Sequence, residues 1–118
     1  MNDKIDLQAL RNLKSMIGDD FDDLAELIED FVTGLPTQMQ HMHDHSARGD
    51  LAALRIVAHS CKSNARDLGA VSLASLCATL ETDCAAGLVD DLPSQLDGIS
   101  SAIDAALKNY STLDLSNV

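Results

Sequence analysis

Apolar residues recur at steps of three and four along most of this chain, which is the spacing of one face of an α-helix. The longest run starts at Phe21 and includes Leu24, Ile28, Phe31, Leu35, Met39 and Met42. No segment shows the sustained alternation of a half-buried strand. The pattern therefore predicts an all-α fold.

Four further segments share this spacing and are bounded by residues that start or stop helices. The boundaries are Asp6 and Gly18, Asp50 and Gly69, Ser72 and the sequence AAG at 85–87, and lastly Asp90 or Asp91, with Pro93 in the first turn of the final helix. The apolar seams that face inward are Leu7, Leu10, Leu13 or Lys14 and Ile17; Leu54, Ala58, Cys61, Ala65 and Leu68; Leu73, Leu76 or Cys77, Leu80 and Cys84; and Leu92, Leu96, Ile99, Ile103, Ala106 and Tyr110.

Four long amphipathic helices with short connections are typical of an antiparallel up-and-down four-helix bundle, here with a short additional N-terminal helix. We expect one domain over residues 1–118, with an N-terminal lid helix at 1–18, the bundle at about 19–112 and a frayed tail at 113–118. Pro36 interrupts the longest segment, and because apolar spacing resumes beyond it, a kink is expected rather than a break.

The amino-acid composition and net charge indicate what kind of core the protein has and which partners are disfavoured. Aromatic residues make up only 3% of the chain against 46% hydrophobic residues, so the core must be aliphatic. A net charge of -11 disfavours binding to nucleic acid or to anionic membranes. No signal peptide or membrane-spanning run is visible, and Cys61, Cys77 and Cys84 lack paired spacing, so we expect a soluble cytoplasmic protein with reduced thiols.

Positive charge is concentrated around one histidine. Residues 46–69 hold four Lys or Arg against two Asp, and helical spacing places Arg55, His59, Lys62 and Arg66 along one exposed face, the basic stripe. A histidine ring is partly neutral near pH 7 and so nucleophilic, and neighbouring cations favour an anionic group such as phosphoryl. Lys62 can approach phosphate oxygens, and the small Ser63 lets a partner come close.

The stretch AHSCKSNARDLGA, residues 58–70, resembles the signature of histidine-containing phosphotransfer domains. His59, Lys62, Ser63, Leu68, Gly69 and Ala70 match that signature. The resemblance extends through LASLCATLE, residues 73–81, and to the long helix around Pro36, so it covers most of the chain. Cys61 stands where the family usually has Leu, and Asn64, Arg66 and Asp67 depart from the commoner small residues.

The resemblance implies a phosphorelay intermediate. His59 would accept a phosphoryl group through Nε2 from the aspartyl phosphate of one response-regulator receiver domain and pass it to the aspartate of another. The upstream partner would be a hybrid sensor histidine kinase. Mg²⁺ is expected in the partner receiver, so this chain is expected to need no cofactor and to have no kinase activity of its own. An initial Met favours a free-standing carrier, which we expect to be a monomer.

Glu81 is a candidate partner for the histidine. His59 lies ten residues before Gly69 and Glu81 twelve after it, or about 15 and 18 Å along antiparallel helices. At such similar heights, Glu81 can accept the Nδ1 hydrogen of His59 and leave Nε2 as the nucleophile. The alternative is an ordinary solvent-exposed carboxylate.

The surface that binds partners is expected to combine Arg55 and Arg66 with apolar residues near the start of the chain. Ile17, Phe21 and Leu24 are the candidates, and packing in the core is the alternative for each.

Two other classes of function stay open from the residues alone. His41 and His45 lie one helical turn apart and, with the cysteines, permit a metal- or redox-responsive bundle, although no third metal ligand is evident and we predict no metal site. The chain can also be an interaction module that works without phosphorylation.

Overall fold

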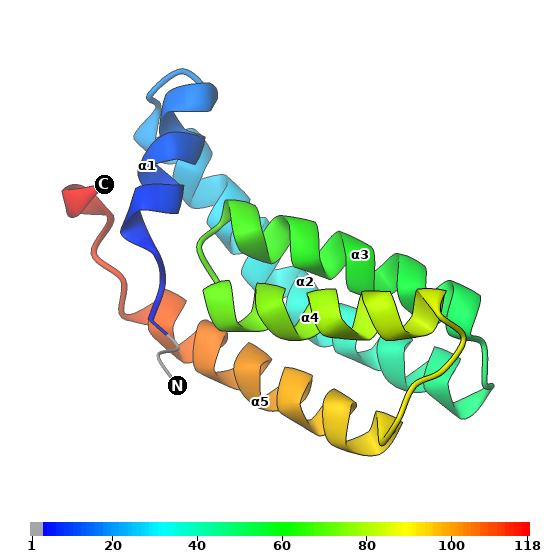
Figure 1. Ribbon diagram of the computed structural model, residues 1–118. Helices are drawn as coiled ribbons and strands as arrows, with labels where there is room; N and C mark the ends of the chain where they lie inside the picture. The colour runs from blue at the N-terminus through cyan, green and yellow to red at the C-terminus, as the bar shows by residue number, and fades with distance from the viewer. Residues whose placement is uncertain (1–3) are drawn as a thin grey trace.

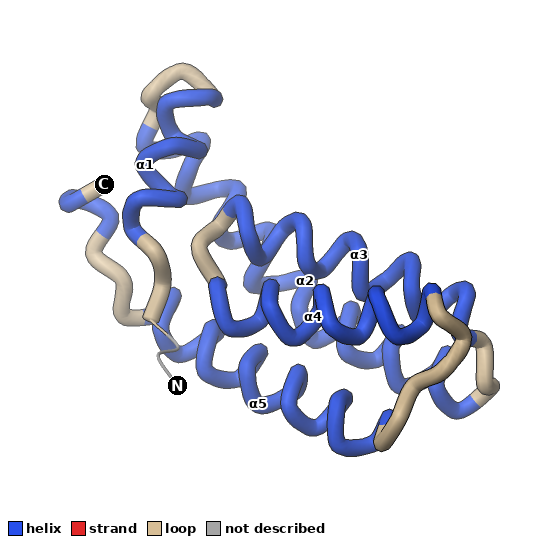
Figure 2. Tube along the Cα trace, in the orientation of Figure 1, coloured by secondary structure: helices blue, strands red, loops and turns tan. Residues whose placement is uncertain are grey.

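The computed structural model describes residues 4–118, and every regular element in that range is a helix (Figures 1 and 2). Within this range the elements are α1 (Leu7–Met16), α2 (Phe21–Ala47), α3 (Leu51–Asp67), α4 (Val71–Ala85), α5 (Leu92–Ser111) and the short 3-10 helix η1 (Leu115–Asn117). The predicted all-α fold is confirmed. The first three residues of the predicted lid segment lie outside the described residues.

Helices α2 to α5 lie side by side with alternating direction and form the predicted four-helix bundle (Figure 1). Each contacts its neighbours in a closed circuit, in which α2 and α4 both pack against α3 on one side and α5 on the other. The molecule is elongated, with principal extents of 43 × 24 × 20 Å.

The length of α2 explains the position of α1. Helix α2 has 27 residues and α3 has 17, or about 40 and 26 Å at 1.5 Å per residue. The first part of α2 therefore extends past the end of α3, and α1 packs against both helices at this end of the bundle (Figure 1). Leu10 of α1 is completely buried, so the additional helix is part of the core.

The predicted apolar seams meet in one aliphatic core. Phe31 is half-buried and packs its ring edge to face against Tyr110, with centroids 5.9 Å apart. Phe21 does not belong to the seam, because as the first residue of α2 it lies at the tip of the molecule and is 48% exposed. Leu24 is 1% exposed, so its prediction as a partner-binding residue is wrong and the alternative, packing in the core, holds.

Helix α2 runs through Pro36 without interruption, so the proline does not break it. Pro36 itself is exposed, whereas Leu35 and Met39 on either side are buried in the core. The packing of these neighbours stabilises the helix where the proline removes a backbone hydrogen bond.

The turn between α3 and α4 is held from two directions. Gly69 has a φ of +84°, and the Asp6 backbone donates its N–H to the Gly69 carbonyl at 2.8 Å. A Cβ atom at Gly69 would lie 2.6 Å from the Asp6 carbonyl oxygen, so only glycine fits. From the other side, the Tyr110 hydroxyl donates to the Leu68 carbonyl at 2.7 Å.

The tail, predicted to fray, is folded in the structure. Leu113, Leu115 and Val118 pack against the core, and Lys14 of α1 donates from Nζ to the Val118 carbonyl at 3.1 Å. These apolar residues lack helical spacing, and α1 comes from the opposite end of the sequence. A reading of local periodicity therefore could not detect this packing.

Candidate functional site

His59 stands on the exposed face of α3. Its side chain is 57% accessible, whereas Ala58 and Cys61 on the opposite face of the helix are buried. The apolar seam of α3 thus fixes which way the histidine points, and it points to solvent rather than into the core.

Glu81 on α4 accepts a hydrogen bond from this ring. The distance from His59 Nδ1 to Glu81 Oε2 is 2.6 Å, as the similar heights of the two residues predicted. Because a carboxylate only accepts, Nδ1 carries the hydrogen, and in the neutral ring Nε2 keeps its lone pair. The nitrogen that does not face Glu81 is therefore the nucleophilic one.

Lys62 binds the other oxygen of the same carboxylate. Its Nζ lies 2.5 Å from Glu81 Oε1, and the Lys62 side chain is only 18% exposed. The placement of Lys62 on the exposed stripe is thus wrong in part, since the side chain folds toward α4 and leaves Arg55, His59 and Arg66 as the exposed members. Sequence spacing gives the face of a residue but not the direction of a long, flexible side chain.

The two donors keep Glu81 ionised. The hydrogen bond from Lys62 is the main cause that lowers the pKa of Glu81 below its ordinary value of 4.5; partial desolvation opposes it, and the hydrogen bond from His59 reinforces it. The site near neutral pH is therefore an ionised carboxylate held between an ammonium and an imidazole ring.

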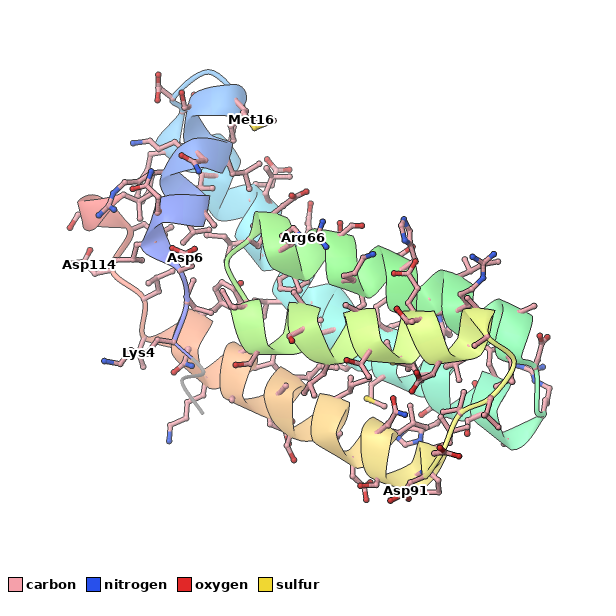
Figure 3. All side chains as sticks on the ribbon, in the orientation of Figure 1. Lys4, Asp6, Met16, Arg66, Asp91 and Asp114 are labelled. Carbon is pink, nitrogen blue, oxygen red and sulfur yellow. The ribbon has the colours of Figure 1, made fainter. Side chains whose placement is uncertain are left out.

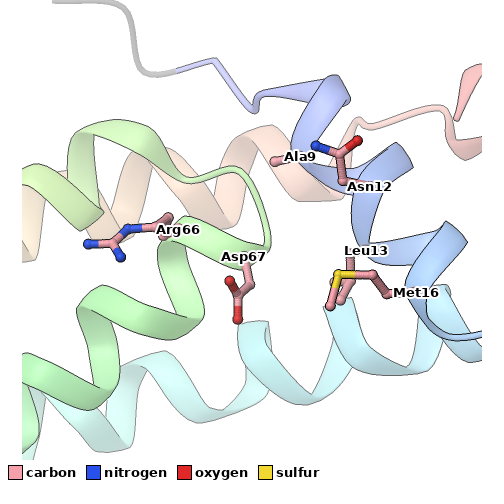
Figure 4. Close-up of a pocket in the computed structure, with 6 residues that line it drawn as sticks. All are labelled: Ala9, Asn12, Leu13, Met16, Arg66 and Asp67. Carbon is pink, nitrogen blue, oxygen red and sulfur yellow. The ribbon is translucent and has the colours of Figure 1, made fainter.

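Two hollows lie beside the basic stripe. One, of about 270 Å³, is lined by Arg55, Ile56, His59, Ser60 and Glu81. The other, of about 180 Å³, lies between α1 and the end of α3 and is lined by Ala9, Asn12, Leu13, Met16, Arg66 and Asp67 (Figure 4). In Figure 3, Arg66 lies at the end of α3 nearest to α1, which carries Met16 at its tip.

Each hollow adds one exposed apolar residue that the sequence reasoning missed, Ile56 in the first and Met16 in the second. Met16 is 82% exposed and Ile56 is 62% exposed, and both are apolar residues outside the seam of their helix. An apolar residue on a polar helix face was the available signal. Of the predicted apolar contacts, Ile17 is half-buried at the end of α1 and Phe21 is exposed nearby. Ser63 is half-buried one turn after His59.

The described residues do not assemble the alternative sites. No group of three or more His, Cys, Asp or Glu in residues 4–118 is arranged to hold a metal ion, and the rings of His41 and His45 are 6.4 Å apart. The three cysteines are free and buried. A hydrogen bond with Cys61 and burial raise the pKa of the Cys77 thiol, and burial raises that of Cys84. Nothing in this arrangement favours a metal or redox function.

Among the described residues, no helix has both the length and the apolar character that crossing a membrane requires.

Comparisons with known proteins identify the family and the fold. A family profile described as Hpt domain matches residues 26–111. The crystal structure of histidine-containing phosphotransfer protein B from Pseudomonas aeruginosa PAO1 has the same fold, with a TM-score of 0.83, 24% sequence identity and 94% of each chain covered. A comparison with curated protein sequences gives no significant match. The family match spans most of the chain and includes His59, so this protein belongs to the Hpt domain family and is a phosphotransfer intermediate of two-component phosphorelays.

Proposed function

We propose that His59 carries the phosphoryl group and that Nε2 is the atom that accepts it. The observation that supports this most directly is the 2.6 Å hydrogen bond from Nδ1 to Glu81, which leaves Nε2 with its lone pair on a side chain that is 57% accessible. A histidine on an exposed helix face would otherwise interconvert freely between its two neutral forms. Glu81 selects the reactive form before any partner arrives.

Phosphoryl transfer requires few groups from this chain, chiefly His59 and Glu81. The Nε2 lone pair attacks the phosphorus of the receiver's aspartyl phosphate, an N–P bond forms, and the P–O bond to the aspartate breaks. The ring gains positive charge while Nδ1 keeps its hydrogen, and the Glu81 carboxylate stabilises that charge. Attack by the aspartate of a second receiver reverses these steps. Mg²⁺ is expected on the receiver, and this chain needs neither a nucleotide nor kinase activity of its own.

Lys62 and Ser63 have supporting roles in this proposal. Lys62 holds Glu81 from its second oxygen, so the carboxylate stays charged and oriented toward the ring. Ser63 is half-buried and small, which leaves room for a receiver loop beside His59.

The partner surface extends from Arg55 and His59 along α3 to the tip of α1. Arg55 and Arg66 are exposed on the same face as His59, and Arg66 also lines the hollow that contains Met16. Cations beside a hollow that exposes apolar side chains such as Met16 suit a receiver domain whose phosphorylation site is acidic, and they provide steering more than lasting affinity. Phe21 and Ile17 lie at the margin of this surface.

The partners in this proposal are a hybrid sensor histidine kinase and response-regulator receiver domains, which meet a monomeric carrier in the cytoplasm. Three buried free thiols are compatible with a reducing compartment. The net charge of -11 continues to disfavour nucleic acid and anionic membranes as partners.

Phosphotransfer from a phosphorylated receiver tests the proposal. We expect an acid-labile, base-stable phosphate on the wild-type protein and none on His59→Gln. His43→Gln is the matched control, because His43 is also exposed on a helix but lies on α2, away from Glu81. A His59→Gln protein that still accepts phosphate, with helical content intact, would exclude His59 as the carrier.

A further inference from the structure

The hollow of about 270 Å³ beside His59 is lined by Arg55 and Ile56, which lie one turn nearer the start of α3, and by Ser60 and Glu81. Side chains on an α-helix lean toward its N-terminus, so the His59 ring leans over the turn that carries Arg55 rather than over the turn that carries Lys62. A phosphoryl group on Nε2 would therefore stand at the mouth of this hollow.

Lys62 is not among the residues that line the hollow. Its ammonium is bound to Glu81 Oε1 at 2.5 Å, on the α4 side of the histidine. If Lys62 moved to a phosphoryl group, it would leave the Glu81 carboxylate with one fewer cation beside the newly added negative charge. Glu81 therefore competes with a phosphoryl group for the Lys62 ammonium.

Arg55 is in neither of the ion pairs that the structure shows among residues 4–118. It is exposed one turn before His59, and within residues 4–118 the structure gives it no carboxylate within salt-bridge distance. A phosphoryl group adds roughly two negative charges beside Glu81, whose own charge is already matched by Lys62. The planar guanidinium can donate to two phosphoryl oxygens at once, which a lysine ammonium does less well.

We infer that Arg55 is the phosphoryl-binding residue of this carrier, and that its guanidinium binds the oxygens of the phosphoryl group on Nε2 of His59 while Lys62 remains on Glu81. This inference rests on the proposed role of His59. It assigns the two cations separate functions, in which Lys62 positions the carboxylate and Arg55 contacts the transferred group.

Chemical phosphorylation tests this without any receiver domain. Phosphoramidate reacts with a histidine ring so that its P–N bond breaks, ammonia leaves and a new N–P bond forms on Nε2. The phosphorylated protein is then titrated by ³¹P NMR, which reports the pKa of the phosphoryl group directly. Loss of a neighbouring cation raises that pKa, because the dianion becomes less stable.

We expect Arg55→Gln to raise the pKa of the phosphoryl group by about 0.2 to 0.7 unit, the range for a solvent-exposed ion pair. Arg55→Lys should restore part of the shift. Arg66→Gln is the matched control, since it removes the same charge from the same helix face but lies seven residues after His59 and outside the hollow. It should leave the phosphoryl pKa within error of wild type.

Three results would overturn the inference. The first is a phosphoryl pKa that does not change in Arg55→Gln. The second is an equal change in Arg66→Gln, which would indicate a diffuse field rather than a contact. The third is a larger change in Lys62→Gln than in Arg55→Gln, which would show that Lys62 leaves Glu81 for the phosphoryl group. Absence of any ³¹P signal from His59 in a folded protein would instead overturn the proposed function, and the inference with it.

Discussion

Tyr110 links α5 to the turn that sets the register of the site. Its hydroxyl donates to the Leu68 carbonyl at 2.7 Å, and the residue is 7% exposed. Burial raises the pKa of Tyr110, so the hydroxyl stays protonated and remains a donor over the physiological range. Replacement of Tyr110 by Phe removes only this hydroxyl and keeps the edge-to-face contact with Phe31.

The loss of stability in Tyr110→Phe comes from the Leu68 carbonyl, which loses its hydrogen-bond donor. A buried acceptor left without a donor costs about 1–3 kcal/mol. For 118 residues at about 2.1 cal/mol/K each, the entropy of unfolding is about 0.25 kcal/mol/K, so Tyr110→Phe should lower Tm by about 4–12 °C.

Thermal unfolding followed by circular dichroism measures this, with Ser111→Ala as the control. The Ser111 hydroxyl also donates to a main-chain carbonyl, that of Lys108 at 2.6 Å, but it is exposed and water can replace it. We expect Ser111→Ala to change Tm by little. If Tyr110→Phe and Ser111→Ala have equal melting temperatures, the Leu68 contact does not stabilise the fold and the reasoning fails.

Three further predictions concern the site and its turn. Glu81→Gln should reduce the fraction of His59 rings with hydrogen on Nδ1, measured by ¹⁵N NMR; because the pKa of Glu81 lies below 4.5, the Tm difference from wild type should be present above pH 4.5 and shrink as pH falls through the lowered value. Lys62→Met should raise the pKa of Glu81, seen in the pH titration of its carboxyl ¹³C signal; an unchanged value would contradict the pairing. Gly69→Ala should destabilise the protein by about 1–3 kcal/mol more than Gly87→Ala, by urea unfolding, because both glycines have positive φ but only Gly69 approaches Asp6. Equal losses would show that the approach of Asp6 imposes no cost.

The helices and the contact between His59 and Glu81 could both be predicted from the sequence. Periodicity located five helical segments, and counting residues from Gly69 placed His59 opposite Glu81, because antiparallel helices joined by a short turn leave little freedom of register. Both inferences use only the regular geometry of the backbone.

The predictions from sequence failed where the structure depends on the direction of a side chain or on contacts between segments far apart in the sequence. The Lys62 side chain turns toward Glu81 because a partly buried carboxylate attracts the nearest ammonium. Helical periodicity predicts the face on which a residue lies but not the direction of a long side chain. Leu24 is in the core because α1 covers the start of α2, a contact between separate elements. The hollow lined by Met16 and Arg66 has the same origin, since it exists only where α1 meets α3.

All three residues that form the charged centre lie on one helical hairpin. His59 and Lys62 belong to α3 and Glu81 to α4, and these two helices are joined by a short turn around Gly69. Helices α2 and α5 support the hairpin through its buried side and contribute nothing to the centre. The hairpin is therefore a transferable unit: residues 50–86, placed in another antiparallel bundle that buries the same seams, should carry the His59–Glu81–Lys62 arrangement with them.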